Sequence, residues 1–204
     1  MQTERQKEII DVALNLIAAK GIQGLTIKNL AREIGISEPA IYRHYENKIE
    51  ILLAILDLFR INSVKLFEQA SGEKSGAMLK IEHLFSSHFT TFSQNPSLVA
   101  VIFSEEIFRN EPVLVEKISE IVSQNDRMLI SIISEGQLEG EIRNDLDAGH
   151  LAIMVMGSLR LFVKRWQFSG HNFSLTEEGH AFLKSVISMI ALNGNIRTIN
   201  KQKS

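Results

Sequence analysis

The side chains best suited to recognising another molecule gather in one segment, TIKNLAREIGISEPAIYRHYENK, residues 26–48. Cationic Lys28, Arg43 and Lys48 occur there together with Tyr42 and His44. Lysine, arginine and tyrosine side chains bind phosphate oxygens, and arginine also forms hydrogen bonds with base edges in a DNA groove. The chemistry that these residues offer is non-covalent recognition of nucleic acid, which requires elements that hold them on one surface.

A helix-turn-helix is predicted for this segment. Thr26 can cap a first helix with an apolar face at spacing i, i+3, i+4 and i+7. Gly35 follows, where a residue that tolerates positive φ can end the helix, and Ser37 can cap a second helix with Pro39 in its first turn. A turn of this length suits a helix-turn-helix. The apolar face of the first helix consists of Ile27, Leu30, Ala31 and Ile34.

The second helix is predicted to have an inward and an outward side. Ile41 and Tyr45 are four residues apart and can both face inward. The outward side, which is the candidate reading surface, then consists of Glu38, Ala40, Tyr42, Arg43 and His44.

At this point the sequence resembles the TetR/AcrR family of transcriptional regulators. The family carries a helix, then a helix-turn-helix that ends in a Tyr-x-His-Phe-like segment with a lysine shortly after, and Tyr42, His44 and Lys48 match that ending. Tyr45 stands where phenylalanine is more usual. The match runs from about residue 8 to residue 53 and includes Gly21, Thr26, Leu30, Ala31, Gly35, Ser37 and Tyr42.

Contact types can be assigned to the segment as a hypothesis. Lys28, Tyr42 and Lys48 would hold phosphates, together with the backbone N–H groups of the helix starts near Thr26 and Ser37. Residues 20–48 carry a formal net charge of only +2, and the chain carries −2 with a pI near 6.3, so two copies acting together would strengthen binding to double-stranded DNA. The residues placed to meet base edges are Glu38, Ala40, Arg43 and His44, with Pro39 beside them.

Composition sets the class of protein. A chain of 204 residues with 45% hydrophobic and 23% charged residues can build a globular core of one or two domains. It has no cysteine, which excludes disulfides and zinc fingers and suits a reducing cytoplasm. We find no signal peptide, membrane-length apolar stretch, nucleophile elbow or dinucleotide-binding glycine motif. We therefore expect no catalytic residues, metal or cofactor.

The predicted fold is all-α. A helix over residues 4–20, with Ile9, Ile10, Ala13, Leu14 and Ile17 buried, would back the helix-turn-helix. Asn47 with Glu50 predicts the start of a further helix toward residue 69, which would act as a lever between domains. We expect a three-helix DNA-binding domain over 1–47, a helical ligand-binding and dimerisation domain over 48–194, and a disordered tail over 195–204.

The second predicted domain holds all eleven phenylalanines and the single tryptophan. Such residues can line a ligand cavity between helices, although aromatic residues at helical spacing are more often ordinary core. The polar residues that could anchor a ligand are Ser86, His88, Glu105 and Arg160. The pool of possible lining residues is Phe85, Phe89, Phe92, Phe103, Phe108, Met128, Met156 and Trp166.

Two apolar helices, near 148–168 and 175–192, are predicted to mediate self-association, with packing inside one chain as the alternative. Ser174 and Glu177 form a capping box for the second. The family resemblance implies a C2 homodimer, which would bind a palindromic operator, and an unknown small-molecule effector that releases the DNA. The rival hypothesis is a helical dimer of the same fold with constitutive DNA binding or a protein-interaction role and no small-molecule ligand.

Overall fold

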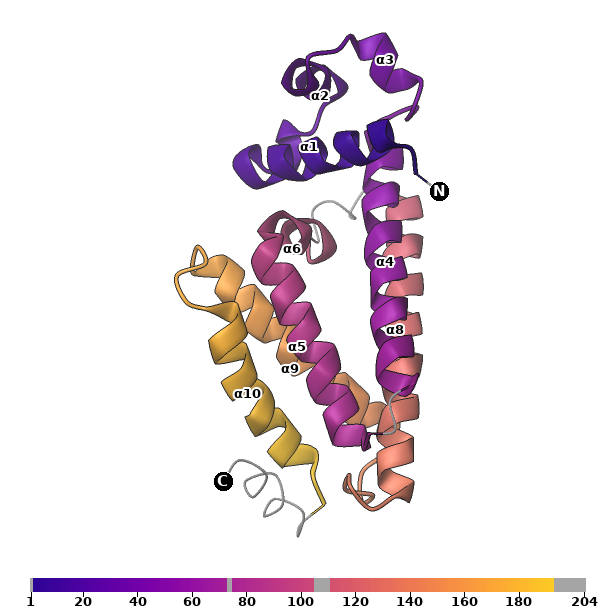
Figure 1. Ribbon diagram of the computed structural model, residues 1–204, viewed down its shortest axis with the longest axis vertical. Coiled ribbons are helices and arrows are strands. Elements are labelled where there is room, and N and C mark those ends of the chain that lie inside the picture. Colours follow the sequence, from indigo (N-terminus) through magenta and orange to yellow (C-terminus); the bar gives the residue numbers. More distant parts are fainter. Residues whose placement is uncertain (1, 73–74, 105–110, 193–204) are drawn as a thin grey trace. The chain divides into compact units, whose positions relative to one another are not determined.

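The computed structural model describes residues 2–72, 75–104 and 111–192, and these residues form an all-α fold as predicted (Figure 1). In this described part of the chain, the only strand-like pairing is an isolated antiparallel bridge between Ile142 and Ala191. None of the described helices combines the length and the apolar character that crossing a bilayer requires.

The chain divides into two compact units. Unit 1 comprises Met1–Asn62 and Asn95–Ile121, and unit 2 comprises Ser63–Gln94 and Val122–Ser204. Two long helices, α4 (Lys48–Gly72) and α8 (Pro112–Leu138), continue from unit 1 into unit 2. The domain boundary near residue 47 stays a prediction.

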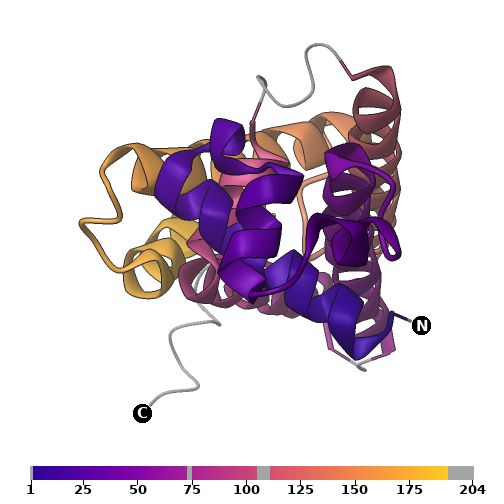
Figure 2. The same cartoon turned by 90° about the horizontal axis from the view of Figure 1, so that it is seen from above.

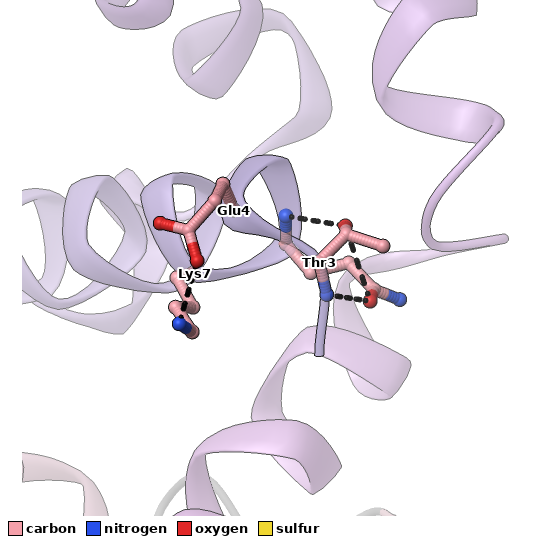
Figure 3. A network of polar contacts seen from close by, with 4 residues as sticks. Thr3, Glu4 and Lys7 are labelled. Carbon is pink, nitrogen blue, oxygen red and sulfur yellow. Dashed lines mark hydrogen bonds and ion pairs between the residues drawn. The ribbon is translucent and has the colours of Figure 1, made fainter. Parts of the chain in front are cut away.

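In unit 1, α1 (Glu4–Lys20) is a helix on which several other elements pack. It begins with a capping box, in which the Thr3 hydroxyl accepts the Gln6 N–H and the Gln6 side chain accepts the Thr3 N–H (Figure 3). Gly21 ends the helix at φ 68°, a conformation that favours glycine. The buried residues are Ile9, Ile10, Ala13, Leu16 and Ile17, so Leu16 takes the place predicted for Leu14, which is only half-buried.

The elements that pack on α1 include η1 (Ile22–Gly24), α2 (Ile27–Ile34) and α6 (Pro96–Ile102). α2 also packs on α3 (Glu38–Tyr42), and Figure 2 shows α1, α2 and α3 from above. The predicted three-helix arrangement around the helix-turn-helix is therefore present in unit 1.

In unit 2, α10 (Leu175–Ile190) packs on α5 (Ala77–Gln94) and on α9 (Ala148–Phe168) (Figure 1). Gly179 allows the close approach of α10 and α5, because a Cβ atom there would lie 2.7 Å from the ring of Phe89. Ser174 caps α10 by accepting the Glu177 N–H at 3.2 Å, as its sequence position predicts.

The last helix is shorter than predicted and ends at Ile190 rather than at residue 192. Its final residues pair with the loop after α8 instead. The Arg143 N–H donates to the Ile190 carbonyl, and the Leu192 N–H donates to the Glu141 carbonyl, both at 2.9 Å. These bonds hold Ala191 in an extended conformation, which ends the helix.

Candidate nucleic-acid interface

The first helix of the helix-turn-helix is set by local hydrogen bonds. The Thr26 hydroxyl accepts the Asn29 N–H at 3.1 Å, which caps α2 as predicted. The Asn29 side chain in turn donates to the Gly24 carbonyl at 2.9 Å. Gly35 adopts the left-handed conformation at φ 78°, and its N–H closes the helix on the Ala31 carbonyl at 3.0 Å. These contacts fix the entry and exit of α2.

The second helix is shorter than the sequence pattern indicates. α3 has five residues and ends at Tyr42, although the His44 and Tyr45 N–H groups still donate to the Ile41 carbonyl. Ser37 occupies the N-cap position, but its hydroxyl makes no capping hydrogen bond, so the predicted cap is absent. Pro39 lies in the first turn, where a backbone N–H would have no carbonyl partner within the helix, so proline causes no loss of a helical hydrogen bond.

Burial separates the two sides of this helix as the spacing predicts. Ile41 is 0% exposed and Tyr45 is 6% exposed, whereas Tyr42 between them is 51% exposed. Ala40 and His44 are half-buried. The remaining candidate contact residues are exposed, namely Thr26, Lys28, Ser37, Glu38, Pro39, Arg43 and Lys48.

Ion pairing divides the cations of this region into two groups. Lys20 and Arg32 both lie near the carboxylate of Glu33, at 3.8 Å and 3.7 Å. Within the described residues, no carboxylate lies at ion-pair distance from Lys28, Arg43 or Lys48. These three cations are therefore the ones best able to meet phosphates or base edges without first breaking a protein contact.

Hydrogen bonds at the start of α4 connect this helix to the end of the helix-turn-helix segment. The Asn47 side-chain oxygen accepts the Ile49 and Glu50 N–H groups at 2.8 and 3.2 Å, and the Glu50 carboxylate accepts the Glu46 N–H at 2.7 Å. This confirms the predicted helix start at Asn47. Burial raises the pKa of the adjacent Tyr45 phenol, and the negative charge of Glu50 raises it further.

The proposed ligand-lining residues are divided between the two units. Phe103 follows α6 in unit 1, whereas the other described members belong to unit 2, and Phe108 lies outside the described residues, as does Glu105. Met128 and Met156 are half-buried. The buried members are Phe85, Phe89, Phe92 and Trp166.

Unit 2 contains an aromatic cluster that sequence reasoning missed. Phe162 on α9 lies 6.0 Å from Phe89, 5.7 Å from Phe173 and 4.6 Å from Phe182, measured between ring centroids. Of these rings, only Phe89 was in the predicted pool. Phe182 lies in the apolar stripe of the last helix, but its stacking on Phe162 depends on how two helices meet, which helical spacing does not specify.

The face of α5 that carries Phe85 and Phe92 also carries His88. The His88 ring lies 6.3 Å from the Phe85 ring and 5.9 Å from the Phe92 ring. Burial lowers the pKa of His88 to about 4, so the imidazole is neutral near pH 7. Elsewhere in the described part of the chain, no three acidic or histidine side chains gather as a metal site would require.

The helix-turn-helix region matches the family model described as "Bacterial regulatory proteins, tetR family" over residues 9–55. Residues 61–189 match a second model, "YsiA-like protein, C-terminal region". Among curated proteins, the chain is 27% identical over 192 residues to the "Fatty acid metabolism regulator protein" of Bacillus subtilis, covering 93% of this chain and 98% of that protein.

Solved structures agree with these matches. The regulator FadR from Bacillus subtilis in complex with stearoyl-CoA superposes with a TM-score of 0.75 at 26% identity, covering 90% of this chain and 98% of that one. The ketosteroid regulator KstR2 of Mycobacterium tuberculosis has a TM-score of 0.78 at 20% identity, with 94% and 97% covered, and so supports the fold. The two family models and the similarity to known regulators together show that this chain is a DNA-binding transcriptional regulator that belongs to the tetR family.

Proposed function

We propose that this protein is a repressor that binds a palindromic operator as a homodimer and releases it when a small apolar or amphipathic ligand binds. The observation that carries the proposal is the outward side of α3, where Tyr42 is 51% exposed although its neighbour Ile41 is fully buried. An exposed aromatic side chain suits a DNA groove better than a solvated surface when it lies beside Arg43, whose guanidinium has no carboxylate at ion-pair distance among the described residues.

Contacts with DNA would divide by chemistry. Lys28, Tyr42 and Lys48 would bind phosphates, together with the backbone N–H groups that follow Thr26 and Ser37. The absent side-chain cap at Ser37 supports this assignment, because its hydroxyl is not used by the helix start. Base edges would be met by Glu38, Ala40, Arg43 and His44, with Pro39 fixing the first turn of α3.

The homodimer would form through α9 and α10. α9 exposes four large apolar side chains, and α10 exposes Met189. A second copy would remove this surface from water, and the resulting C2 symmetry would present two reading surfaces to two half-sites. The exposed residues of α9 are Ile153, Met154, Leu161 and Phe168, and Leu192, which is also exposed, follows the end of α10.

The effector that we propose is a long-chain acyl thioester, of the class bound by the Bacillus subtilis relative in its complex with stearoyl-CoA. The apolar chain would require a lining of apolar side chains. On this hypothesis the lining would be drawn from the described unit 2 members of the pool, Phe85, Phe89, Phe92, Met128, Met156 and Trp166, with residues 48–194 forming the regulatory domain and residues 1–47 the reading domain. The cytoplasm is where such a regulator would meet its operator.

Selection of bound DNA tests the proposal. Fragmented genomic DNA from the source organism would be mixed with purified protein at near-physiological salt, and the recovered fragments would be sequenced. We expect a palindromic motif, less enrichment with the Arg43→Ala variant, and release by stearoyl-CoA. No enrichment at any salt concentration would refute operator binding, and enrichment that stearoyl-CoA leaves unchanged would refute the proposed effector.

Solution mass tests the dimer separately. We expect twice the chain mass of 23.0 kDa at micromolar concentration, and a monomer for Leu161→Glu, which places a charge on the exposed apolar face. A monomeric wild-type protein would contradict the dimer.

A further inference from the structure

The helix that leaves the DNA-reading unit carries an acidic residue with a partner far along the chain. α4 begins at Lys48, the last residue of the segment 26–48 that carries the candidate DNA contacts, and its first turn is hydrogen-bonded to Asn47 and Glu46. Farther along the same helix, the Asp57 carboxylate lies 2.8 Å from the Lys117 ammonium of α8. Any displacement of α4 along α8 would therefore have to break or stretch this ion pair.

Lys117 is well enclosed for a lysine. Its side chain is 18% exposed, and its ammonium also lies 3.3 Å from the Glu120 carboxylate on α8. The hydrogen bond to Asp57 is the main reason that the pKa of Lys117 is raised, so the ammonium stays charged. Asp57 also accepts from Arg60 at 3.3 Å on its own helix. The cluster contains two cations and two carboxylates and joins α4 to α8 within unit 1.

α8 is held at its other end as well. It continues from unit 1 into unit 2, where the Glu135 carboxylate contacts the buried ammonium of Lys80 on α5 with both oxygens at 2.8 Å. One unbroken helix of 27 residues thus carries a charged contact to α4 near its start and another to α5 near its end.

We propose that Asp57 and Lys117 are positioning residues for the helix-turn-helix. Their ion pair, here called the clamp, holds α4 against α8 and so raises the affinity for the operator without contact to DNA. The inference rests on the proposed operator binding. A clamped α4 limits the positions that the reading surface can adopt in the free protein, and this reduces the entropy lost when DNA binds. Breaking the clamp from either side should weaken binding.

Charge-removing variants of the two partners separate this role from long-range electrostatics. Asp57→Asn makes the net charge of the protein more positive, and Lys117→Gln makes it more negative. If only the net charge affected DNA binding, the two affinities would therefore change in opposite directions. The clamp predicts that both move in the same direction. Glu68→Gln and Lys65→Gln serve as controls, because they make the same two charge changes at exposed positions of α4.

The measurement is the dissociation constant for the selected operator fragment by fluorescence anisotropy, at fixed salt, with protein whose active fraction is known from stoichiometric titration. We expect both single variants to bind about fivefold more weakly, which corresponds to about 1 kcal/mol. The conservative variant Lys117→Arg, which keeps the positive charge opposite Asp57, should bind within about twofold of wild type, as should the two controls.

Affinities within twofold of wild type for both single variants, or shifts in opposite directions, would overturn the proposal while leaving operator binding intact. If the wild-type protein selects no DNA, the proposed function fails by itself. Hydrogen exchange then decides about the clamp without DNA. The amides of residues 51–60 should exchange faster in both Asp57→Asn and Lys117→Gln, and unchanged exchange would refute the clamp.

Discussion

Replacing Tyr45 by phenylalanine should stabilise the protein, because the phenol oxygen is a buried polar group with no hydrogen-bond partner in the described part of the chain. The side chain is 6% exposed, so the ring packs in the core while its hydroxyl has given up hydration. An unsatisfied buried hydroxyl costs about 1–3 kcal/mol, and phenylalanine keeps the ring contacts. The expected gain is therefore about 1–3 kcal/mol less a small term for the void left by one oxygen.

Urea denaturation followed by circular dichroism measures this gain, and thermal melting should show a rise of about 2–4 °C per kcal/mol for a chain of this size. Tyr42→Phe is the matched control, because it removes the same atom from a side chain that is 51% exposed, and its effect should stay within about 0.5 kcal/mol.

Alkaline pH provides a second test of the same reasoning. The pKa of Tyr45 is raised in the folded protein, so the unfolded chain ionises first and wild-type stability falls as the pH rises above the ordinary value of 10.0. Tyr45→Phe has no such group, and its advantage over wild type should widen there. If Tyr45→Phe is no more stable than wild type at pH 7, and the difference in stability between the two proteins stays constant as the pH rises above 10.0, the claim that the hydroxyl is unsatisfied is refuted.

Three further outcomes are expected in unit 2. In urea denaturation, Glu135→Gln should destabilise the protein by about 1–3 kcal/mol more than Lys80→Met. Glu135→Gln leaves the positive charge of Lys80 uncompensated on a side chain that is 6% exposed, whereas Lys80→Met leaves Glu135, which is 46% exposed and can be hydrated alone. Equal losses of stability in the two variants would contradict this reasoning. Gly179→Ala should lower the free energy of unfolding by about 1–3 kcal/mol, because the added Cβ would lie 2.7 Å from the Phe89 ring. A melting temperature equal to that of wild type would show that the ring can move aside without loss of stability. Burial lowers the pKa of His88 from 6.5 to about 4, so the stability that the neutral imidazole contributes is complete above pH 6.5 and is lost as the pH falls toward 4. The melting temperature of wild type should therefore drop more steeply than that of His88→Gln between pH 7 and pH 5. Parallel curves would count against an enclosed imidazole.

Signals that act over a few residues could be predicted correctly from the sequence. The cap at Thr26, the left-handed Gly35 and the helix start at Asn47 each depend on neighbours within four positions. The spacing of residues on a helix also predicted correctly that Ile41 and Tyr45 face inward and that Tyr42 faces outward. The same local rules failed where several short-range options compete, as at Ser37, whose hydroxyl does not cap α3, and at Tyr42, where that helix ends early.

Only the tertiary structure decided which residues meet across helices. Asp57 and Lys117 are sixty positions apart, and their ion pair depends on the relative placement of α4 and α8, which no spacing in either helix specifies. The contact of Phe89 with Phe162, and the need for glycine at position 179, arise in the same way from the meeting of α5, α9 and α10. Periodicity determines the face on which a side chain lies, because it follows from the geometry of one helix; the partner on that face depends on the packing of several helices at once.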